Sequence, residues 1–156
     1  MTEPPTRPTF ETAPARGQIR DGVHRLVLRV YYEDTDASGL VYYASYLRFI
    51  ERSRTDLLRC LGISHTALAS NHGLAFAVSR CELAFLAPGR LDDALEVHTS
   101  LLAIGGATIT ARQLVSRDQI ELLRARLRLA CIDRAGRPHR LPEPVRAALA
   151  AIPLSA

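Results

Sequence analysis

The chain of 156 residues contains no tryptophan and no lysine, so all twenty of its basic residues are arginines. Sixteen acidic residues reduce the net charge to +4, and the two signs are interleaved along the chain. A nucleic-acid-binding domain concentrates positive charge on one element or stripe, so this pattern argues against nucleic acid as a partner. The small positive charge favours anionic small-molecule partners instead.

Long hydrophobic runs are also missing. No stretch approaches the roughly 18 apolar residues that a membrane-spanning helix requires. The N-terminal segment carries four prolines among its first fourteen residues, as well as Glu3 and Glu11, and it lacks the apolar core of a signal peptide. We therefore expect a cytoplasmic protein that does not insert into membranes.

Cysteines are few, and their three positions, Cys60, Cys81 and Cys131, are far apart. This arrangement has neither the close pairs of a zinc site nor the even count of a secreted disulfide framework. We expect three buried, reduced side chains, because free cysteine is among the most buried residue types. The histidines also lack metal-ligand spacing, so we expect surface positions for them, no metal and no cofactor. They are His24, His65, His72, His98 and His139.

Hydrophobic residues make up 47% of the chain and charged residues 23%, ordinary values for a single globular domain of this length. Residues 1–21 are rich in Pro, Thr and Ala and have no periodicity. We expect this segment to be a disordered tail and residues 22–156 to form one domain.

Hydrophobic periodicity predicts the order of the elements. Apolar residues alternate from His24 to Tyr32, as in a strand, and a polar turn over 33–39 ends in glycine. Apolar spacings of three, four and seven then predict a helix over 43–61, which Gly62 ends. Ser64 is a suitable N-cap for a short second helix running to Asn71. Further strands are expected at 74–85 (with a bulge near Ser79), 94–104, 107–115 and 120–133, followed by a short helix at 142–152.

Antiparallel strands in series need a hydrophobic cover on one face, and the first helix is the only one long enough to supply it. We therefore predict an α+β fold in which a curved antiparallel sheet of about five strands wraps round one long central helix. A second copy of the chain would most simply cover the open face and edges of this sheet. A homo-oligomer, either a dimer or a tetramer, is expected.

The turn that leads into the long helix is the densest polar cluster of the sequence, because Glu33, Asp34 and Asp36 fall within four positions. The first amides of a helix have no intrahelical acceptor and carry part of the helix dipole. A carboxylate beside such amides supplies a base or nucleophile next to an oxyanion site, as acyl transfer requires. Acidic residues before a helix are also common capping groups. The pattern alone leaves both interpretations open.

The segment 31–54, YYEDTDASGLVYYASYLRFIERSR, strongly resembles the signature of hotdog-fold acyl-CoA thioesterases. The match is closest to the 4-hydroxybenzoyl-CoA thioesterase branch, particularly to its subgroup encoded with the Tol-Pal cell-envelope proteins. It continues through the strand order and the stretch APGRLDD at 87–93, and covers about residues 24–140. The resemblance implies a hotdog fold and hydrolysis of acyl-CoA to free acid and thiol. Acyl carrier protein is an alternative carrier of the acyl group.

The resemblance also implies two catalytic positions. The aspartate that lies three residues before a glycine is the family's catalytic carboxylate, and here it is Asp36, followed by Gly39. The backbone amide seven residues further on, at the N-terminus of the helix, polarises the thioester carbonyl, and here it belongs to Tyr43. The Tol-Pal subgroup commonly has histidine at that position, so Tyr43 looks like the hydroxybenzoyl-type enzymes. Asp36 acts either as a nucleophile or as a general base, and the sequence does not separate the two roles.

The substrate-binding residues implied in the same way are Gly39, Val41, Tyr42, Tyr46 and Arg90. Three tyrosines, Tyr32, Tyr42 and Tyr46, either line the acyl pocket or belong to the ordinary core, and core is the commoner outcome for such a stripe. Arg90 is the best candidate for a phosphate contact. A second candidate group is the set Arg124, Arg126 and Arg128, for which a solvated strand face is the favoured alternative.

Other polar residues receive structural interpretations. Asp34 is expected to be a turn or capping residue and Glu33 a surface acid, while Glu51 and Arg54 have the spacing of a structural ion pair.

Two other functions remain as alternatives. Hotdog hydratases and dehydratases generally pair an acid with a histidine on the central helix or its lead-in, and no histidine lies between Val41 and Leu61. A non-enzymatic acyl-thioester-binding protein is disfavoured by the intact aspartate of the turn.

Overall fold

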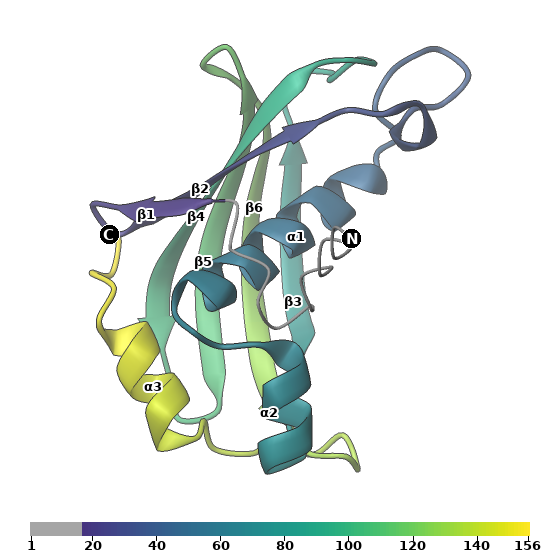
Figure 1. Cartoon of the computed structure of the whole chain (residues 1–156). Helices are drawn as coiled ribbons and strands as arrows, with labels where there is room; N and C mark the ends of the chain where they lie inside the picture. Colours follow the sequence, from purple (N-terminus) through teal and green to yellow (C-terminus); the bar gives the residue numbers. More distant parts are fainter. Residues whose placement is uncertain (1–16) are drawn as a thin grey trace, which may run out of the picture.

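The computed structural model describes residues 17–156, so most of the predicted tail lies outside the described residues. The expected α+β architecture is confirmed: a six-stranded antiparallel sheet with strand order β1-β2-β4-β5-β6-β3 packs against helices (Figure 1). The strands are β1 (Gln18–Arg20), β2 (Val23–Arg29), β3 (Ala75–Phe85), β4 (Ala94–Ile104), β5 (Thr108–Arg117) and β6 (Ile120–Ile132). The helices are α1 (Ser45–Cys60), α2 (His65–His72) and α3 (Glu143–Ala150), with a short 3-10 helix, η1, over Tyr32–Asp34.

The sixth strand, β1, falls within the segment predicted to be a tail, so the predicted boundary at residue 21 was wrong. Ile19 pairs with His24 across a two-residue turn made of Asp21 and Gly22. Both turn residues have positive φ angles, 51° and 75°, because such a two-residue turn matches the twist of the strands that it joins. An Asp-Gly pair before a strand is a hairpin signal that the sequence carried.

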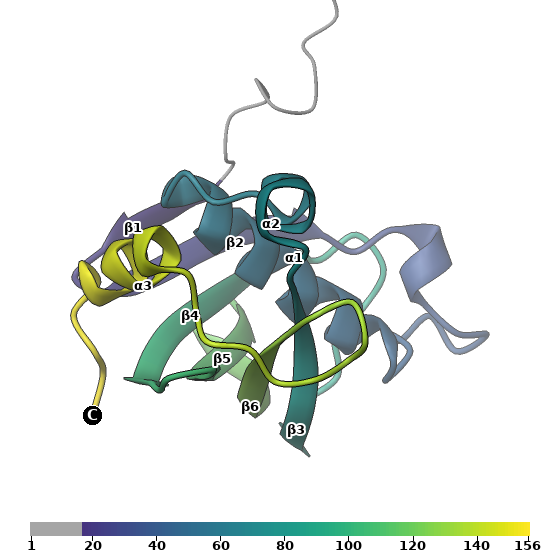
Figure 2. The ribbon, with the colours of Figure 1, turned by 90° about the horizontal axis from the view of Figure 1, so that it is seen from below.

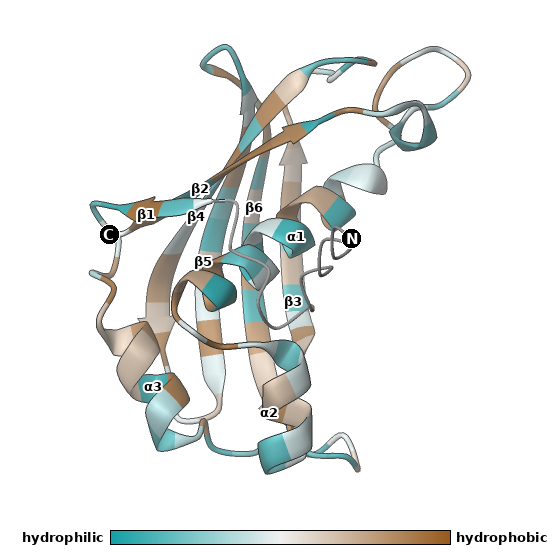
Figure 3. Ribbon diagram, in the orientation of Figure 1, coloured by the Kyte–Doolittle hydropathy of each residue, from teal (hydrophilic) through white to brown (hydrophobic). Residues whose placement is uncertain are grey.

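The sheet curves around α1, and Figure 2 shows the helices on one side of it. The residues of α1 that face the sheet include Phe49 and Ile50, which pack against Leu95 and Val97 of β4. Along β6, Leu123 and Leu127 point into this core, and Figure 3 shows hydrophobic and hydrophilic residues alternating along the strands. The three arginines that alternate with these leucines along β6 are exposed on the outer face of the sheet, as expected for a solvated strand face. They are Arg124, Arg126 and Arg128.

The smaller local predictions are confirmed. The Ser64 hydroxyl caps α2 by accepting a hydrogen bond from the Ala67 amide at 3.0 Å, and Gly73 ends the helix in the left-handed conformation. The register of β3 against β6 shifts between Val78 and Arg80, where the bulge was expected. None of the helices within residues 17–156 is long and apolar enough to cross a membrane.

A buried polar network joins α1 to the sheet, and it includes His24, which we expected at the surface. That expectation was wrong because His24 shares the inner face of β2 with Leu26. The His24 Nε2 atom lies 2.8 Å from Asp56 Oδ2, and Nδ1 lies 3.2 Å from the Ser53 hydroxyl. Burial lowers the pKa of His24, although Asp56 opposes this effect, so the imidazole is neutral at pH 7.

The network continues from Ser53 through Thr99 to Gln113, with hydroxyl-to-hydroxyl and amide-to-hydroxyl distances of 2.8 and 2.7 Å. Arg54 donates to Gln113 Oε1 at 2.9 Å, while Glu51 is exposed. The predicted ion pair between Glu51 and Arg54 was therefore wrong, because the guanidinium turns under the helix toward the sheet. Every buried side-chain nitrogen and oxygen of the described residues has a hydrogen-bond partner.

The three cysteines are free thiols with different exposure. Cys131 is buried and Cys60 is half-buried, but Cys81 is exposed. The prediction of burial is confirmed for Cys131, holds only in part for Cys60, and was wrong for Cys81, because β3 is an edge strand that the described chain covers along one side only.

The buried His24 predicts how stability depends on pH. Its pKa is lower in the folded state than the usual value of about 6.5, so the unfolded chain binds more protons once the pH falls below that value. The free energy of unfolding should therefore decrease as the pH falls from about 7.5 to about 5.5, measured by urea denaturation. The variant His24→Asn should show a smaller decrease. An unchanged pH dependence would contradict this, and the exposed His139→Asn variant is the control.

Candidate active site

Asp36 lies in a tight hairpin between η1 and α1. Its amide donates to the Leu40 carbonyl at 2.9 Å, and the Gly39 amide donates back to the Asp36 carbonyl at 3.0 Å. Gly39 has a φ of 77°, a left-handed conformation that glycine adopts without strain. The predicted glycine-ended turn is confirmed, and it fixes the backbone of Asp36.

The Asp36 carboxylate is held by its own loop. Its Oδ1 atom accepts hydrogen bonds from the Ser38 amide, at 2.8 Å, and from the Ser38 hydroxyl. These two bonds lower the pKa of Asp36 below its usual value. The side chain is exposed in the single chain. It is therefore an ionised carboxylate with its Oδ1 atom engaged.

The neighbouring acids take the structural roles that were predicted. Asp34 is buried, and its carboxylate accepts from the Tyr31 amide at 2.8 Å at the start of η1, which confirms a capping role. The Asp34 carbonyl also accepts from the Tyr42 amide at 2.9 Å, so η1 and the end of the hairpin are joined. Glu33 is exposed, as expected.

Tyr43 lies two residues before α1, which begins at Ser45, so its amide is not the first of the helix as we expected. The helix begins later because the Ser45 amide closes a turn on the Tyr42 carbonyl at 2.8 Å. No acceptor within residues 17–156 takes the Tyr43 amide hydrogen. The residue as a whole is 63% exposed.

The segment 89–91 runs beside the hairpin and includes Arg90, the predicted phosphate contact. The Val41 amide donates to the Gly89 carbonyl at 2.9 Å, and Leu40 forms an isolated bridge with Arg90. The Arg90 side chain is exposed next to the hairpin, while Val41 is buried. The structure thus brings Asp36, Gly39, Val41 and Arg90 into one pair of adjacent loops.

The predicted tyrosines separate into exposed and buried groups. Tyr42 and Tyr43 are exposed and their ring centroids lie 4.7 Å apart, whereas Tyr32 points away from the core with 84% of its surface exposed. Tyr46 is only 3% exposed, so the favoured assignment of this stripe to the core is right for Tyr46 and wrong for Tyr32 and Tyr42. Its hydroxyl accepts a hydrogen bond from the Gly89 amide at 2.9 Å.

Phe85 is a site residue that sequence reasoning missed. It ends β3, is half exposed, and its ring centroid lies 6.4 Å from that of Tyr43 and 5.9 Å from that of Tyr46. Only the pairing of β3 with β6 brings it next to the segment before α1, so no local pattern could reveal it. Together Tyr42, Tyr43 and Phe85 form an exposed aromatic surface beside the hairpin.

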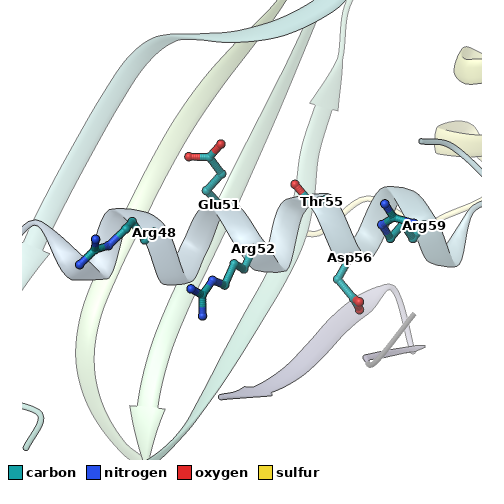
Figure 4. Close-up of a pocket in the computed structure, with 6 residues that line it drawn as sticks. All are labelled: Arg48, Glu51, Arg52, Thr55, Asp56 and Arg59. Carbon is teal, nitrogen blue, oxygen red and sulfur yellow. The ribbon is translucent and has the colours of Figure 1, made fainter. Parts of the chain in front are cut away.

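The five hollows described for the chain lie elsewhere. One has a volume of about 360 Å³, and Figure 4 shows that its lining residues all come from successive turns of α1. They are Arg48, Glu51, Arg52, Thr55, Asp56 and Arg59. Neither this hollow nor the four others described contains Asp36 or Tyr43. The hairpin and its aromatic surface therefore form an open site in one chain.

One group of described residues has the composition of a metal site: His24, Asp56 and Cys60 bring three ligand atoms within 4.8 Å of one another. Asp56 Oδ2 already accepts hydrogen bonds from His24 and, at 2.7 Å, from the Gly17 amide. These contacts belong to the polar network between α1 and β2, so we assign the group to packing and not to the active site.

The hydrogen bonds to Asp36 predict a shift in the pH profile. The variant Ser38→Ala removes the hydroxyl bond, so the pKa of Asp36 should rise toward its usual value. If the ionised carboxylate reacts, the acid limb of kcat/KM should move to higher pH, with little change near pH 7. An acid limb at the wild-type position would contradict this. Ser70→Ala, an exposed serine in α2, is the control.

Comparisons with known proteins show which family the chain belongs to. The sequence model of the thioesterase-like superfamily matches residues 30–149. An acyl-CoA thioesterase YbgC of Haemophilus influenzae is 41% identical over 122 residues, which cover 78% of this chain and 90% of that protein. The acyl-CoA thioester hydrolase YbgC of Escherichia coli O6:H1 is 39% identical over 123 residues, 78% of this chain and 91% of that protein.

Among solved structures, the crystal structure of a probable thioesterase from Bartonella henselae superposes with a TM-score of 0.75. It is 37% identical in sequence, and the match covers 77% of this chain and 99% of that one. The expected hotdog fold is confirmed by this neighbour and by the family match. Because the family model and the relatives match most of its length, the chain belongs to the thioesterase-like superfamily.

Proposed function

We propose that the protein hydrolyses acyl-CoA thioesters to a free acid and a thiol, and that the Asp36 carboxylate acts on the thioester carbonyl. The observation that carries this proposal is the pairing of an ionised Asp36, held by Ser38, with an uncommitted Tyr43 amide seven residues later. The curated relatives at about 40% identity are named for hydrolysis of acyl-CoA, and this supports the choice of substrate class.

The proposed chemistry needs an oxyanion donor and a carboxylate. The Tyr43 amide would donate to the carbonyl oxygen as negative charge develops on it, and one well-placed donor contributes about 10²–10³ in rate. The carbon–sulfur bond breaks to release a thiolate, which is a much weaker base than an alkoxide and so leaves without a strong acid.

Two roles for Asp36 fit this geometry. As a nucleophile, its oxygen would bond to the carbonyl carbon and give a mixed anhydride, which water then hydrolyses back to the carboxylate. As a general base, it would take a proton from the attacking water. Both routes consume one water and yield the same acid and thiol.

The aromatic surface of Tyr42, Tyr43 and Phe85 supports an apolar acyl group in this proposal, because it is exposed directly beside the reacting groups. Arg90, next to the hairpin, is the proposed contact for a phosphate of coenzyme A. Three finer expectations stay predictions: acyl carrier protein as an alternative carrier, the link to Tol-Pal proteins, and a cytoplasmic location.

We further propose that a second copy of the chain encloses the site, in a dimer or tetramer. Among residues 17–156, the edge strand β3 pairs with β6 on one side only, so alternate residues along it present backbone N–H and C=O groups on the other side. Val78, Phe85 and Leu86 expose apolar surface along or just beyond this strand. A partner that covers this edge would also cover the aromatic surface, because Phe85 belongs to both.

Removing the Asp36 carboxylate tests the proposed function. Asp36→Ala should lower thiol release from acyl-CoA by about 10²–10⁴-fold without unfolding the protein. The control is Asp133→Ala, because Asp133 is also a turn aspartate that accepts from backbone amides, those of Ala135 and Arg137, at 2.9 and 3.0 Å. Its thiol release should match wild type.

The assay should screen short, medium, long and aromatic CoA esters, and it should include absorbance at the enoyl-CoA band. Full activity of Asp36→Ala would overturn the assignment of Asp36. Hydration of enoyl-CoA without thiol release would favour a hydratase, and thermal stabilisation by acyl-CoA without any turnover would favour a binding protein.

The proposed oligomer predicts a solution mass that is a multiple of the 17.2 kDa chain. Light scattering should give two or four copies, and activity per chain should fall as dilution dissociates them. A monomer with undiminished activity would contradict the proposal that a second copy completes the site.

A further inference from the structure

The segment 88–93 holds the Asp36 hairpin to the body of the protein. On one side it pairs with the hairpin: the Gly89 carbonyl accepts from the Val41 amide at 2.9 Å, and the Leu91 amide donates to the Gly39 carbonyl at 3.2 Å. The hairpin also reaches the core through its buried Val41, and it continues into η1 and the start of α1. Its outer part, with Gly39 and Leu40 next to Asp36, is held by the pairing with this segment.

The other side of the segment is joined to the chain that follows β2. The Val30 amide donates to the Asp93 carbonyl at 2.9 Å, and the Asp92 amide donates to the Val30 carbonyl at 3.1 Å. Val30 is fully buried in the main core. The segment thus bridges the rigid sheet and the catalytic hairpin.

Tyr46 of α1 fixes the middle of this bridge. Its hydroxyl accepts from the Gly89 amide at 2.9 Å, so a single residue, Gly89, bonds to Tyr46 through its N–H and to Val41 through its carbonyl. The contact is close, because a β-carbon at Gly89 would lie 2.9 Å from a Val41 methyl group and 3.1 Å from the Tyr46 oxygen. Burial raises the pKa of Tyr46, which keeps the hydroxyl neutral.

Asp93 and Arg117 fix the end of the bridge. One oxygen of Asp93 accepts from the Arg90 amide at 2.8 Å and from the Arg117 guanidinium at 2.7 Å. Burial alone would raise the pKa of Asp93, but the bonds from Arg117 and from the Arg90 amide outweigh it and lower the pKa. Both side chains are mostly covered, at 19% and 25% exposed, so this pair is better shielded from water than an ordinary surface ion pair.

We infer that Tyr46 and the Asp93–Arg117 pair are positioning residues of the active site. They hold segment 88–93, and through it the Asp36 hairpin, in register with the Tyr43 amide. This inference rests on the proposed function. A displacement of about 1 Å between a reacting group and its substrate can cost about 10² in rate, so contacts that fix the loop affect turnover without touching the substrate.

The test compares Tyr46→Phe and Asp93→Asn with wild type. Tyr46→Phe keeps the ring that packs against Phe49 and Phe85 and removes only the acceptor of the Gly89 amide. Each variant should lower kcat about tenfold, because the Asp36 hairpin loses its support. Any rise in KM should be smaller than the fall in kcat, although Arg90, the proposed phosphate contact, lies in the same segment. The double variant should lose less than the product of the two single losses, since both act on one loop.

Hydrogen exchange supplies a readout that a general loss of stability would not give. In both variants the peptide 34–42 should exchange faster than in wild type, while β4 and β5 keep their protection. Asp133→Asn is the matched control, because it weakens another loop held by an Asp–Arg pair. In that loop Arg137 Nε lies 3.2 Å from Asp133 Oδ2. It should leave kcat and the exchange of 34–42 unchanged.

Two results would overturn the inference. Unchanged hydrogen exchange of peptide 34–42 would show that these side chains do not fix the hairpin. Faster exchange together with a wild-type kcat would show that fixing the hairpin does not affect turnover. If wild type releases no thiol, the proposed function fails at that point. The exchange experiment still decides whether the three side chains fix the hairpin.

Discussion

The backbone pairing between residues 39–41 and 89–91 is the constraint on which the candidate site depends. A hairpin as short as the one that carries Asp36 has no core of its own. Its geometry comes from a left-handed glycine, from the Ser38 bonds to the carboxylate, and from this pairing with a second loop. Tyr46 ties that second loop to the long helix, and Asp93 ties it to the sheet through Arg117. The Asp36 carboxylate is thus fixed by elements whose own stability comes from the core.

Polar groups serve two purposes in this fold. Inside, the network from Asp56 through His24 and Ser53 to Gln113 is fully paired and holds α1 on the curved sheet. Ahead of α1, in contrast, the Asp36 carboxylate is exposed and the Tyr43 amide has no acceptor among residues 17–156. A buried polar group without a hydrogen bond would lower the stability of the fold, whereas an exposed amide can bond to water until a substrate replaces that water. The open geometry of one chain is consistent with a site that a second copy closes.

The sequence predicted the elements whose pattern is local. The alternation in β6, the Ser64 cap, the bulge in β3 and the glycine-ended turn at Gly39 all depend on a few neighbouring residues, and all are present. The failures concern tertiary position. His24 is buried because β2 faces α1, Arg54 bonds to Gln113 across the core, and Cys81 is exposed because β3 is an edge strand. The strand β1 was missed although Asp21 and Gly22 signalled its turn.

The candidate site divides in the same way. Asp36, Gly39 and Tyr43 belong to one contiguous motif, and the structure confirms the glycine-ended turn that joins the first two. Phe85 and Arg117 lie in β3 and β5, and Asp93 lies in the loop before β4, so only the fold brings them near the hairpin of Asp36. The boundary of α1 shows the limit of periodicity: the apolar pattern runs back to Tyr43, but the turn closed by Ser45 delays the helix.

The most direct measurement is a crystal structure of the Asp36→Asn variant with an intact acyl-CoA bound. The account predicts that the thioester carbonyl carbon lies about 3–3.5 Å from the side chain at position 36, with its oxygen bonded to the Tyr43 amide and the acyl group on the surface that includes Phe85. A thioester bound elsewhere, with its carbonyl remote from both position 36 and the Tyr43 amide, would contradict the account.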